Sequence, residues 1–460
     1  MSTPAATAAT SDFFLPDLLR NKYKIIGIIG EGAYGVVCSA EDPDTGEKVA
    51  IKRIKRVMDS YPMATRILRE LKFLRLLSAH ENIVKVRDVL IPGDKDKFND
   101  TYVVFELMPM DLRRLLRSKT ELKSEHLKYF MWQILRGINF LHSSRVFHRD
   151  LKPDNILINA KCGVRICDFG LARAAFENQE DMVFWTNYVA TRWYRAPELV
   201  SAHFTSYSTA IDMWSVGCIF GEIISRGKPL FPGRNEIDLM EKIICVTGSP
   251  NPEALSKMRN PTMREKIAAL PFQKPVQLGL IFPDADPLCL DLLSKVLVFD
   301  PDRRLSAREA LEHEFFAEFR HMGFGPPGVE LTKNDFSFER KKMTQEDMRL
   351  EFLNEILYYH PDLKGEMLEG TKYGYQMPSM ADQFGEAMEG VEQKTGKSSS
   401  TTLPKEVLAE LNVSVLQHFF SPLRHLTPVF FSFPRNAQKN KRVNYKATTF
   451  GEKELAKYNK

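Results

Sequence analysis

The chain is 460 residues long, which at about 100–200 residues per domain predicts two to four hydrophobic cores. Hydrophobic residues make up 43% of it and charged residues 27%, which excludes collagen-like, mucin-like and wholly disordered chains. The net charge is +5, but the segment from Arg435 to Lys460 alone carries eight Lys or Arg and two Glu. The rest of the chain is therefore close to neutral, and no nucleic-acid-binding surface is expected there.

The N-terminal part predicts a short arm followed by a β-rich lobe over residues 21–108. Residues 1–20 have no hydrophobic periodicity and no signal-peptide pattern, and are expected to be a disordered arm. Runs of β-branched or aromatic residues bounded by Gly, Pro or Asp then predict strands at 22–30, 34–41, 47–54 and 101–107. Between them, apolar residues at helical spacing predict one helix from about Met63 to Leu77.

Helical patterns dominate residues 109–319. Ser124 is a candidate N-cap for an amphipathic helix that extends past Leu141. The segment Ala210–Ile224 is apolar on nearly every side, which is typical of a helix buried in a large core. More helices are expected near 235–247, 287–298 and 306–318. The chain thus predicts an α+β fold with a β-rich small lobe, a mainly helical large lobe and a cleft between them.

The pattern decays after about Asn354, and residues 361–460 are predicted to form a poorly ordered basic tail. The apolar patch Val413–Phe433 is interrupted by Arg424, two His and two Pro, so no membrane span is expected. The six Cys show neither a CxxC pair nor zinc-type spacing, which indicates reduced thiols and a location in the cytoplasm and nucleus. Lys439–Arg442 is either a nuclear address or part of a solvated tail.

A glycine-rich segment joins the first two predicted strands, Gly30-Glu31-Gly32-Ala33-Tyr34-Gly35. No helix follows it, which excludes the dinucleotide-binding fingerprint because that motif needs a helix N-terminus. Glycines in a hairpin let the backbone close over phosphates; the alternative is a hairpin that is merely flexible.

The third predicted strand carries Ala50 and Lys52, which the period of two places on one face. Ala50 leaves room for a flat ring, and Lys52 offers a positive charge to phosphates. Glu70, on the predicted helix, is a candidate partner for Lys52. The alternatives are an ordinary edge lysine and a solvated helix glutamate.

Chemistry is indicated most strongly by the loop His148–Asn155, HRDLKPDN, in which polar and charged groups crowd between two apolar stretches. Pro153 keeps this segment a loop. Asp168-Phe169-Gly170 follows thirteen residues later. Asp150, Asn155 and Asp168 together supply a base and hard oxygen ligands, a set suited to magnesium-dependent phosphoryl transfer.

With Ala196-Pro197-Glu198, these elements stand in the order found in the eukaryotic protein kinases, which the sequence resembles from about Tyr23 to Glu339. The resemblance implies ATP and Mg²⁺ as cofactors. It implies that Asp150 takes or orients the proton of the substrate hydroxyl, that Lys152 steadies the γ-phosphate, and that Asn155 and Asp168 hold magnesium. It also implies two structural contacts: Asp212 should support the catalytic-loop backbone, and Glu198 should pair with Arg304.

The same resemblance implies a set of residues around the nucleotide. Lys52, paired with Glu70, would hold the α- and β-phosphates. Val36, Ala50 and Leu157 would sandwich the adenine, with Phe105 as gatekeeper, Glu106 and Met108 in the hinge and Asp111 near the ribose. The glycine-loop residues expected at ATP are Ile29, Gly30, Glu31, Gly32, Ala33, Tyr34, Gly35, Val36 and Val37. Cys167, directly before Asp168, is either a packing residue or a reactive thiol facing this pocket.

The subfamily is indicated by Thr186-Asn187-Tyr188, which precedes VATRWYRAPE and resembles the activation lip of the mitogen-activated protein (MAP) kinases. The segments 230–233 and 243–250 resemble an insert shared by MAP kinases and cyclin-dependent kinases. NDFSFE at 334–339 resembles the MAP kinase extension that returns to the small lobe, here placed at residues 320–360. The central Asn187 is similar to that of fungal sporulation-specific MAP kinases.

The resemblance therefore implies a proline-directed Ser/Thr kinase, activated when an upstream dual-specificity kinase phosphorylates Thr186 and Tyr188 and reversed by phosphatases. Its substrates would be proteins with Ser/Thr-Pro sites. One alternative is a cyclin-dependent-like kinase, although its cyclin-binding helix motif is absent. The other is a pseudokinase scaffold, which the presence of all four catalytic polar residues disfavours. In one departure, no acidic docking patch follows Phe316.

Overall fold

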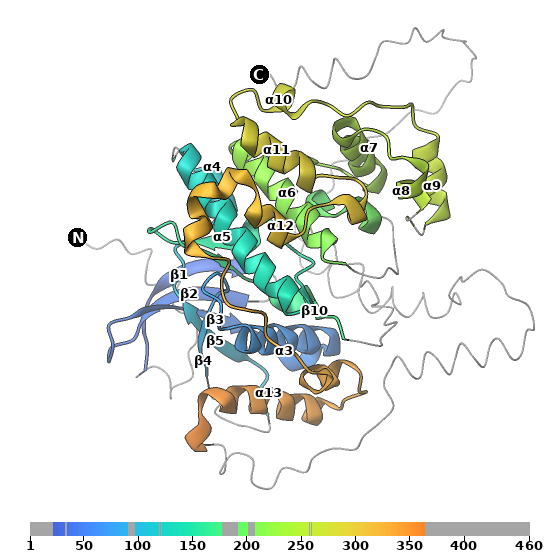
Figure 1. The fold of residues 1–460 in the computed structure, drawn as a ribbon. Coiled ribbons are helices and arrows are strands. Elements are labelled where there is room, and N and C mark those ends of the chain that lie inside the picture. Colours follow the sequence, from blue (N-terminus) through green and yellow to red (C-terminus); the bar gives the residue numbers. More distant parts are fainter. Residues whose placement is uncertain are drawn as a thin grey trace, which may run out of the picture. The chain divides into compact units, whose positions relative to one another are not determined.

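The computed structural model describes residues 22–32, 35–90, 97–118, 120, 122–176, 192–200, 208–256, 258 and 260–363. The chain divides into two units, residues 1–379 and 380–460, and every described residue belongs to the first. Figure 1 shows the arrangement of its helices and strands. No helix among these residues is long and apolar enough to cross a membrane.

The small lobe is built on an antiparallel sheet of five strands in the order β1-β2-β3-β5-β4. The strands are β1 (Lys24–Gly32), β2 (Gly35–Glu41), β3 (Lys48–Ile54), β4 (Val86–Val89) and β5 (Thr101–Glu106). Four of them were predicted. The sequence analysis missed β4, because its four residues VRDV include two charged ones and give no clear alternation.

Alternation along these strands separates the two faces of the sheet. One face packs into a small hydrophobic core that includes Val36, Cys38, Val49, Ile51 and Val104. Side chains on the opposite face of the sheet, including that of Lys52, point away from this core.

One helix, α3 (Tyr61–Leu76), accompanies the sheet, close to the predicted bounds. Pro62 stands in its first turn, where the missing N–H removes no intrahelical hydrogen bond. Its apolar residues Ile67, Leu71 and Leu74 are buried as expected. Its charged residues are buried as well, which shows that α3 is enclosed on several sides: Arg66, Arg69, Glu70 and Lys72.

The large lobe is mainly helical. Its helices are α4 (Leu112–Arg117), α5 (Ser124–Ser143), α6 (Ala210–Ile224), α7 (Glu236–Thr247), α8 (Pro252–Ser256), α9 (Pro261–Ala268), α10 (Leu278–Ile281), α11 (Pro287–Val296) and α12 (Ala307–Glu312). Short strands complete it: β6 (Met110–Asp111), β8 (Ile156–Ile158) and β9 (Val164–Ile166) in one sheet, and β7 (Val146–Phe147) with β10 (Arg173–Ala174) in another. The α+β fold with two lobes is confirmed.

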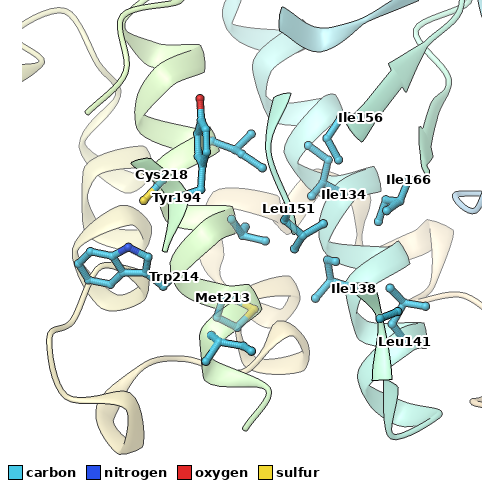
Figure 2. Packing of buried hydrophobic residues seen from close by; sticks show 14 of the residues in the cluster. Ile134, Ile138, Leu141, Leu151, Ile156, Ile166, Tyr194, Met213, Trp214 and Cys218 are labelled. Atoms are coloured by element: carbon cyan, nitrogen blue, oxygen red, sulfur yellow. The ribbon is translucent and has the colours of Figure 1, made fainter. Parts of the chain in front are cut away.

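Helices α5 and α6 form the centre of this lobe, and the loop His148–Asn155 packs against both. Figure 2 shows Leu151, from the HRDLKPDN loop, between Ile134 and Ile138 of α5 and Met213 of α6. All four side chains belong to the main hydrophobic core and are almost fully buried. This loop is therefore anchored by an apolar side chain in its middle.

Two helix boundaries differ from the sequence prediction. Ser124 is the first residue of α5, and Lys123 takes the cap position. The helix expected near 306–318 ends at Glu312, because His313 has extended backbone angles; a 3₁₀ segment, Glu314–Met322, follows. Both differences are local: His126 Nδ1 accepts the Lys123 backbone N–H at 3.2 Å, and His313 Nδ1 accepts that of Phe315 at 3.2 Å.

The C-terminal extension returns to the small lobe. It contains a 3₁₀ segment, Lys333–Glu339, and helix α13 (Gln345–Tyr359), which packs against α3 and β4. In Figure 1, α13 runs beside α3 below the sheet. Phe336 of the 3₁₀ segment lies with its ring centroid 4.5 Å from that of Phe73 in α3.

A chain ending at Gly365 is expected to keep the melting temperature and the in vitro activity of the full chain. The apolar contacts of α13 are all retained in it, and residues beyond 365 offer little patterned apolar surface to offset the entropy of ordering them. Thermal unfolding and peptide phosphorylation of both chains check this. A large loss of either would mean that Val413–Phe433 binds the body of the protein.

Candidate active site

The face of the sheet opposite the small core presents Val37, Ala50, Lys52 and Phe105. Residues paired directly across antiparallel strands point to the same face, and the register pairs Val37 with Lys52 and Ala50 with Phe105. The sequence-based placement of Ala50 and Lys52 on one face is thus confirmed.

Val36 does not belong to this face. It is paired with Glu31 and Arg53 and is buried in the small core on the other side of the sheet. Its predicted contact with adenine must be corrected, because one residue along a strand reverses the side-chain direction. Val37 occupies the position that the prediction gave to Val36.

The glycine-rich hairpin is formed by the end of β1 and the start of β2. Gly30 is paired with Val37, Gly32 with Gly35, and the turn residues Ala33 and Tyr34 lie outside the described residues. Gly35 could not be replaced, because a Cβ there would lie 1.7 Å from the backbone oxygen of Arg53. Ile29 and Glu31 are part of β1, with Ile29 exposed.

Lys52 and Glu70 form the predicted ion pair. Lys52 Nζ lies 3.1 Å from Oε1 and 3.2 Å from Oε2 of Glu70, whose side chain is almost fully buried. Burial by itself lowers the pKa of Lys52, but the charges of Glu70 and Asp168 more than reverse this, so its pKa is raised. Lys52 therefore stays charged, which its predicted role at the phosphates requires.

The catalytic loop brings three predicted residues into mutual contact. Lys152 Nζ lies 2.5 Å from Oδ2 of Asp150. Asn155, at the end of the 3₁₀ turn Pro153–Asn155, donates from Nδ2 to the backbone oxygen of Asp150 at 2.8 Å. Because the amide nitrogen is used inside the loop, the amide oxygen of Asn155 is the atom suited to a cation.

Asp212 supports this loop, as predicted. Its carboxylate is fully buried at the start of α6 and accepts backbone N–H groups from His148 at 2.9 Å and Arg149 at 2.8 Å, with His142 Nε2 at 3.1 Å. Burial alone would raise the pKa of Asp212, but the contacts with His142 and the loop lower it. The ionised carboxylate holds Arg149 at φ +70°, a conformation that costs a non-glycine residue energy.

Asp168 is held next to Lys52 by the left-handed conformation of its backbone (φ +63°). Arg66 of α3 lies 3.4 Å from Asp168 Oδ1. Burial would raise the pKa of Asp168, but the positive charges of Arg66, Lys52 and Lys152 lower it. A Cβ at Gly170 would come within 2.5 Å of Arg66 Nε, so a larger residue there would displace the Arg66 side chain.

Two acidic side chains at and just after the end of β5, those of Glu106 and Asp111, make structural hydrogen bonds. Glu106 Oε1 accepts from the Lys85 backbone N–H and from Arg165 Nε, both at 3.0 Å, and the Glu106 backbone N–H donates to the Lys85 carbonyl at 3.1 Å. Asp111 caps α4 by accepting the Arg114 N–H at 2.8 Å. Met108 is buried, and Leu157 is paired with Asp111 across β8 and β6.

Glu198 and Arg304 form the predicted ion pair, with two contacts of 2.7 Å between the guanidinium and the two carboxylate oxygens. Arg304 also stacks on Trp214, 5.0 Å from the ring centroid. The pair ties the end of the APE motif to the helical core.

Comparisons with known proteins agree with this geometry. The family model described as protein kinase domain matches residues 23–316. Mitogen-activated protein kinase 14 of Oryza sativa subsp. japonica is 46% identical over 395 residues, which cover 86% of this chain and 72% of the relative. Mitogen-activated protein kinase 15 of the same organism is also 46% identical over 395 residues, covering 86% of this chain and 79% of the relative. The chain belongs to the MAP kinase family.

A third relative comes from another plant. Mitogen-activated protein kinase 16 of Arabidopsis thaliana is 44% identical over 395 residues, covering 86% of this chain and 69% of the relative. These matches establish this MAP kinase as a protein serine/threonine kinase, and a kinase domain implies ATP as its substrate.

Some predicted residues of this MAP kinase are not tested by the geometry. Thr186, Asn187 and Tyr188 lie outside the described residues, and so do Ala33 and Tyr34. Cys167 is described: burial raises the pKa of its thiol, with further contributions from Asp168 and Glu70. A thiol of raised pKa is a poor nucleophile, which favours packing over reactivity.

The sequence analysis missed several contacts of this MAP kinase. Arg66 contacts Asp168, which the sequence analysis did not predict. Glu339 of the extension bonds to Arg69 and lies 3.7 Å from Arg173. Helical spacing could have placed Arg66 beside Glu70, since they are four residues apart. Nothing in the local sequence indicates that Glu339 lies beside Arg69, 270 residues away.

Proposed function

We propose that this MAP kinase is proline-directed and is switched on when an upstream dual-specificity kinase phosphorylates Thr186 and Tyr188 in a signalling cascade, and that phosphatases reverse this. The observation that carries the proposal is the assembled catalytic loop, in which Asp150 contacts Lys152 and Asn155 on a backbone fixed by Asp212. An enzyme with this loop needs only correct placement of ATP and the substrate hydroxyl.

Each residue of the site has a separate role in the reaction. Asp150 accepts or orients the proton of the attacking Ser or Thr hydroxyl, while Lys152, 2.5 Å away, offsets charge on the transferred phosphoryl group. Lys52 binds the α- and β-phosphates, oriented by Glu70. The adenine lies against Val37, Ala50 and Leu157.

The donor set also fits magnesium. The carboxylate of Asp168 and the amide oxygen of Asn155 are hard oxygen ligands, and phosphate oxygens and water would complete six-fold coordination. When bound, Mg²⁺ neutralises charge that develops on the phosphates. The described residues contain no cluster of three or more His, Cys, Asp or Glu that could hold a metal without such phosphate ligands.

Peptides that differ in one residue test the proposed specificity. The dually phosphorylated full chain should phosphorylate a Ser-Pro peptide and leave the matched Ser-Ala and Tyr-Pro peptides nearly untouched, measured as initial rates with radiolabelled ATP. Equal rates on Ser-Pro and Ser-Ala would remove proline direction from the proposal while leaving kinase activity intact.

Two alternatives remain weaker. A cyclin-dependent-like kinase shares the catalytic loop, but the relatives reported above are named MAP kinases. A pseudokinase scaffold conflicts with the Lys52–Glu70 pair. We further propose the domain limits given above (1–20, 21–108, 109–319, 320–360 and 361–460), residence in cytoplasm and nucleus, and a relationship to sporulation-type members through Asn187.

Docking of basic peptides is expected to be weak. Between Ala317 and Lys333 the acidic residues are Glu318, whose carboxylate lies 3.3 Å from Lys128 Nζ, and Glu330, which lies far from it in the sequence; nearby Glu314 is 2.8 Å from Arg320. Glu318 and Glu314 are already paired and no acidic pair occurs in this range, so a Lys/Arg-rich MAP kinase docking peptide gains little.

Fluorescence anisotropy with such a peptide should show weak binding that disappears as salt rises towards physiological strength. The same peptide with Gln in place of Lys and Arg is the control. A low-micromolar Kd that persists at physiological salt would show that acids elsewhere assemble a docking site.

A further inference from the structure

Helix α3 makes ion pairs in three directions, and one of them has no role in the site described so far. Glu70 faces Lys52, and Arg66 faces Asp168. Lys72 and Arg75 face away from both, towards helix α13 of the C-terminal extension. At 3.6 residues per turn, Lys72 lies about 200° around the helix from Glu70, so the two sit on nearly opposite sides.

The partner of both cations is Glu355. Lys72 Nζ lies 3.0 Å from its Oε1, Arg75 Nη2 lies 2.9 Å from the same oxygen, and Arg75 Nε lies 2.7 Å from its Oε2. Glu355 is only 4% exposed. A two-pronged guanidinium–carboxylate contact fixes direction as well as distance, and burial removes the water that could replace it.

Two aromatic rings flank the contacts of Glu355 with Lys72 and Arg75. Arg75 lies over the ring of Tyr358, 4.9 Å from its centroid, and Lys72 lies 5.6 Å from the ring of Phe338. Rotating α3 about its axis, or sliding it along α13, would break both ion pairs and both ring contacts together.

Helix α13 also contacts the small lobe outside α3. Gln345 Nε2 donates at 3.0 Å to the backbone oxygen of Met58, in the 3₁₀ turn Val57–Asp59 before α3, and Arg349 Nε donates at 3.2 Å to that of Phe98, before β5. Beyond its C-terminal end, His360 Nε2 lies 3.1 Å from the backbone oxygen of Val89 in β4. The extension therefore links α3 to the sheet that carries Lys52.

We propose that Glu355 is a positioning residue for nucleotide binding: by holding Lys72 and Arg75 it fixes α3 so that Glu70 meets Lys52. Helix α13 thus acts as a built-in activating element, occupying the side of α3 that faces away from the site. This inference rests on the proposed function of the Lys52–Glu70 pair at the phosphates of ATP.

The test compares the affinity of four full-length variants for Mg-ATP, measured by isothermal titration calorimetry. Glu355→Gln should bind about tenfold more weakly than wild type, the size of one lost charge-assisted contact, and Glu70→Gln should do the same. The double variant should be no weaker than either single one, because residues that act through one contact are not additive. Glu351→Gln is the matched control: it removes a carboxylate 3.2 Å from the same Lys72, but one that is 30% exposed, and should change affinity less than twofold.

The outcomes separate this inference from the proposed function. If Glu70→Gln leaves Mg-ATP affinity unchanged, the role of Lys52–Glu70 fails and the inference fails with it. If Glu70→Gln weakens binding but Glu355→Gln only lowers the melting temperature, or if the two effects add, Glu355 is structural and the inference alone is overturned. Should Glu355→Gln not fold, Arg75→Lys is the second test, because it keeps the charge but loses the two-pronged contact. It should weaken binding about threefold, and unchanged affinity would overturn the inference.

Discussion

Asp150→Asn is expected to reduce turnover by roughly a thousandfold while leaving Mg-ATP affinity within about twofold of wild type, because general-base catalysis contributes about 10²–10⁴ to rate. Asp150 contacts Lys152 and Asn155, both in the catalytic loop. Asparagine keeps the shape of the side chain but cannot accept the hydroxyl proton.

Asp168→Asn is expected to reduce turnover and also to weaken Mg-ATP binding. The Asp168 carboxylate lies in the field of Arg66, Lys52 and Lys152, which keeps it ionised. Because its pKa is lowered, Asp168 loses its charge only when the pH falls below the range in which carboxyl groups usually titrate. Lowering the pH to a value above that range should therefore not mimic the substitution. The neutral amide removes the carboxylate that Arg66 contacts, whereas Lys52 keeps Glu70 and Lys152 keeps Asp150.

Initial rates and calorimetric titration of both variants distinguish the two roles. Asp154→Asn is the matched control in the same loop, since Asp154 is half exposed and contacts Arg113 at 2.8 Å. It should keep nearly the full rate. Wild-type rates in either Asp150→Asn or Asp168→Asn would contradict the assignment of the catalytic loop.

The sequence predicted the parts of the site that depend on local spacing. Period 2 placed Ala50 and Lys52 together, and the family resemblance supplied the pairs Lys52–Glu70 and Glu198–Arg304, which the structure confirms. The error at Val36 arose when the family's adenine contact was carried over one residue out of register, and one residue along a strand reverses the side-chain direction.

Long-range contacts could not be predicted from local patterns. Glu355 and Glu339 both appear in the sequence as ordinary acidic residues on amphipathic segments, and both are bound to α3 more than 250 residues away. Their burial depends on where the extension packs, which helical periodicity does not specify. The same reasoning explains why Lys72, charged and on a helix, would have been assigned to solvent.

The second large effect concerns activation: full activity is expected only when Thr186 and Tyr188 are both phosphorylated. Three arginines already converge on the segment after Asp168. Arg69 Nη1 donates to the backbone oxygen of Gly170 at 2.6 Å, Arg149 Nη1 to that of Leu171 at 3.1 Å, and Arg173 Nη1 to that of Ala172 at 2.8 Å. Together with Arg66 they are the candidate receivers for a phosphate on Thr186.

A phosphate adds about −1.5 to −2 charge and three acceptor oxygens, so it can form one to three charge-assisted hydrogen bonds with such a cluster. Arg66 and Arg69 belong to the helix that carries Glu70, and Arg149 precedes Asp150, so a phosphate bound among them would couple α3 to the catalytic loop. By family analogy, the phosphate on Tyr188 pairs with Arg192 and Arg195 and shapes the pocket for the proline after the target residue. Asn187 carries no charge and should mimic neither phosphate.

Turnover on a Ser-Pro peptide should therefore rise by on the order of a hundredfold or more in the doubly phosphorylated chain, since each 1.4 kcal/mol of added contact is worth tenfold. Unphosphorylated protein, and Thr186→Ala or Tyr188→Phe after treatment with the upstream kinase, should stay near the basal rate. Asn187→Ala, which leaves both phosphate acceptors, is the matched control and should be activated like wild type. Full activity of Tyr188→Phe would show that Thr186 alone is the switch, and full activity of the unphosphorylated chain would show that the arginine cluster needs no phosphate at all.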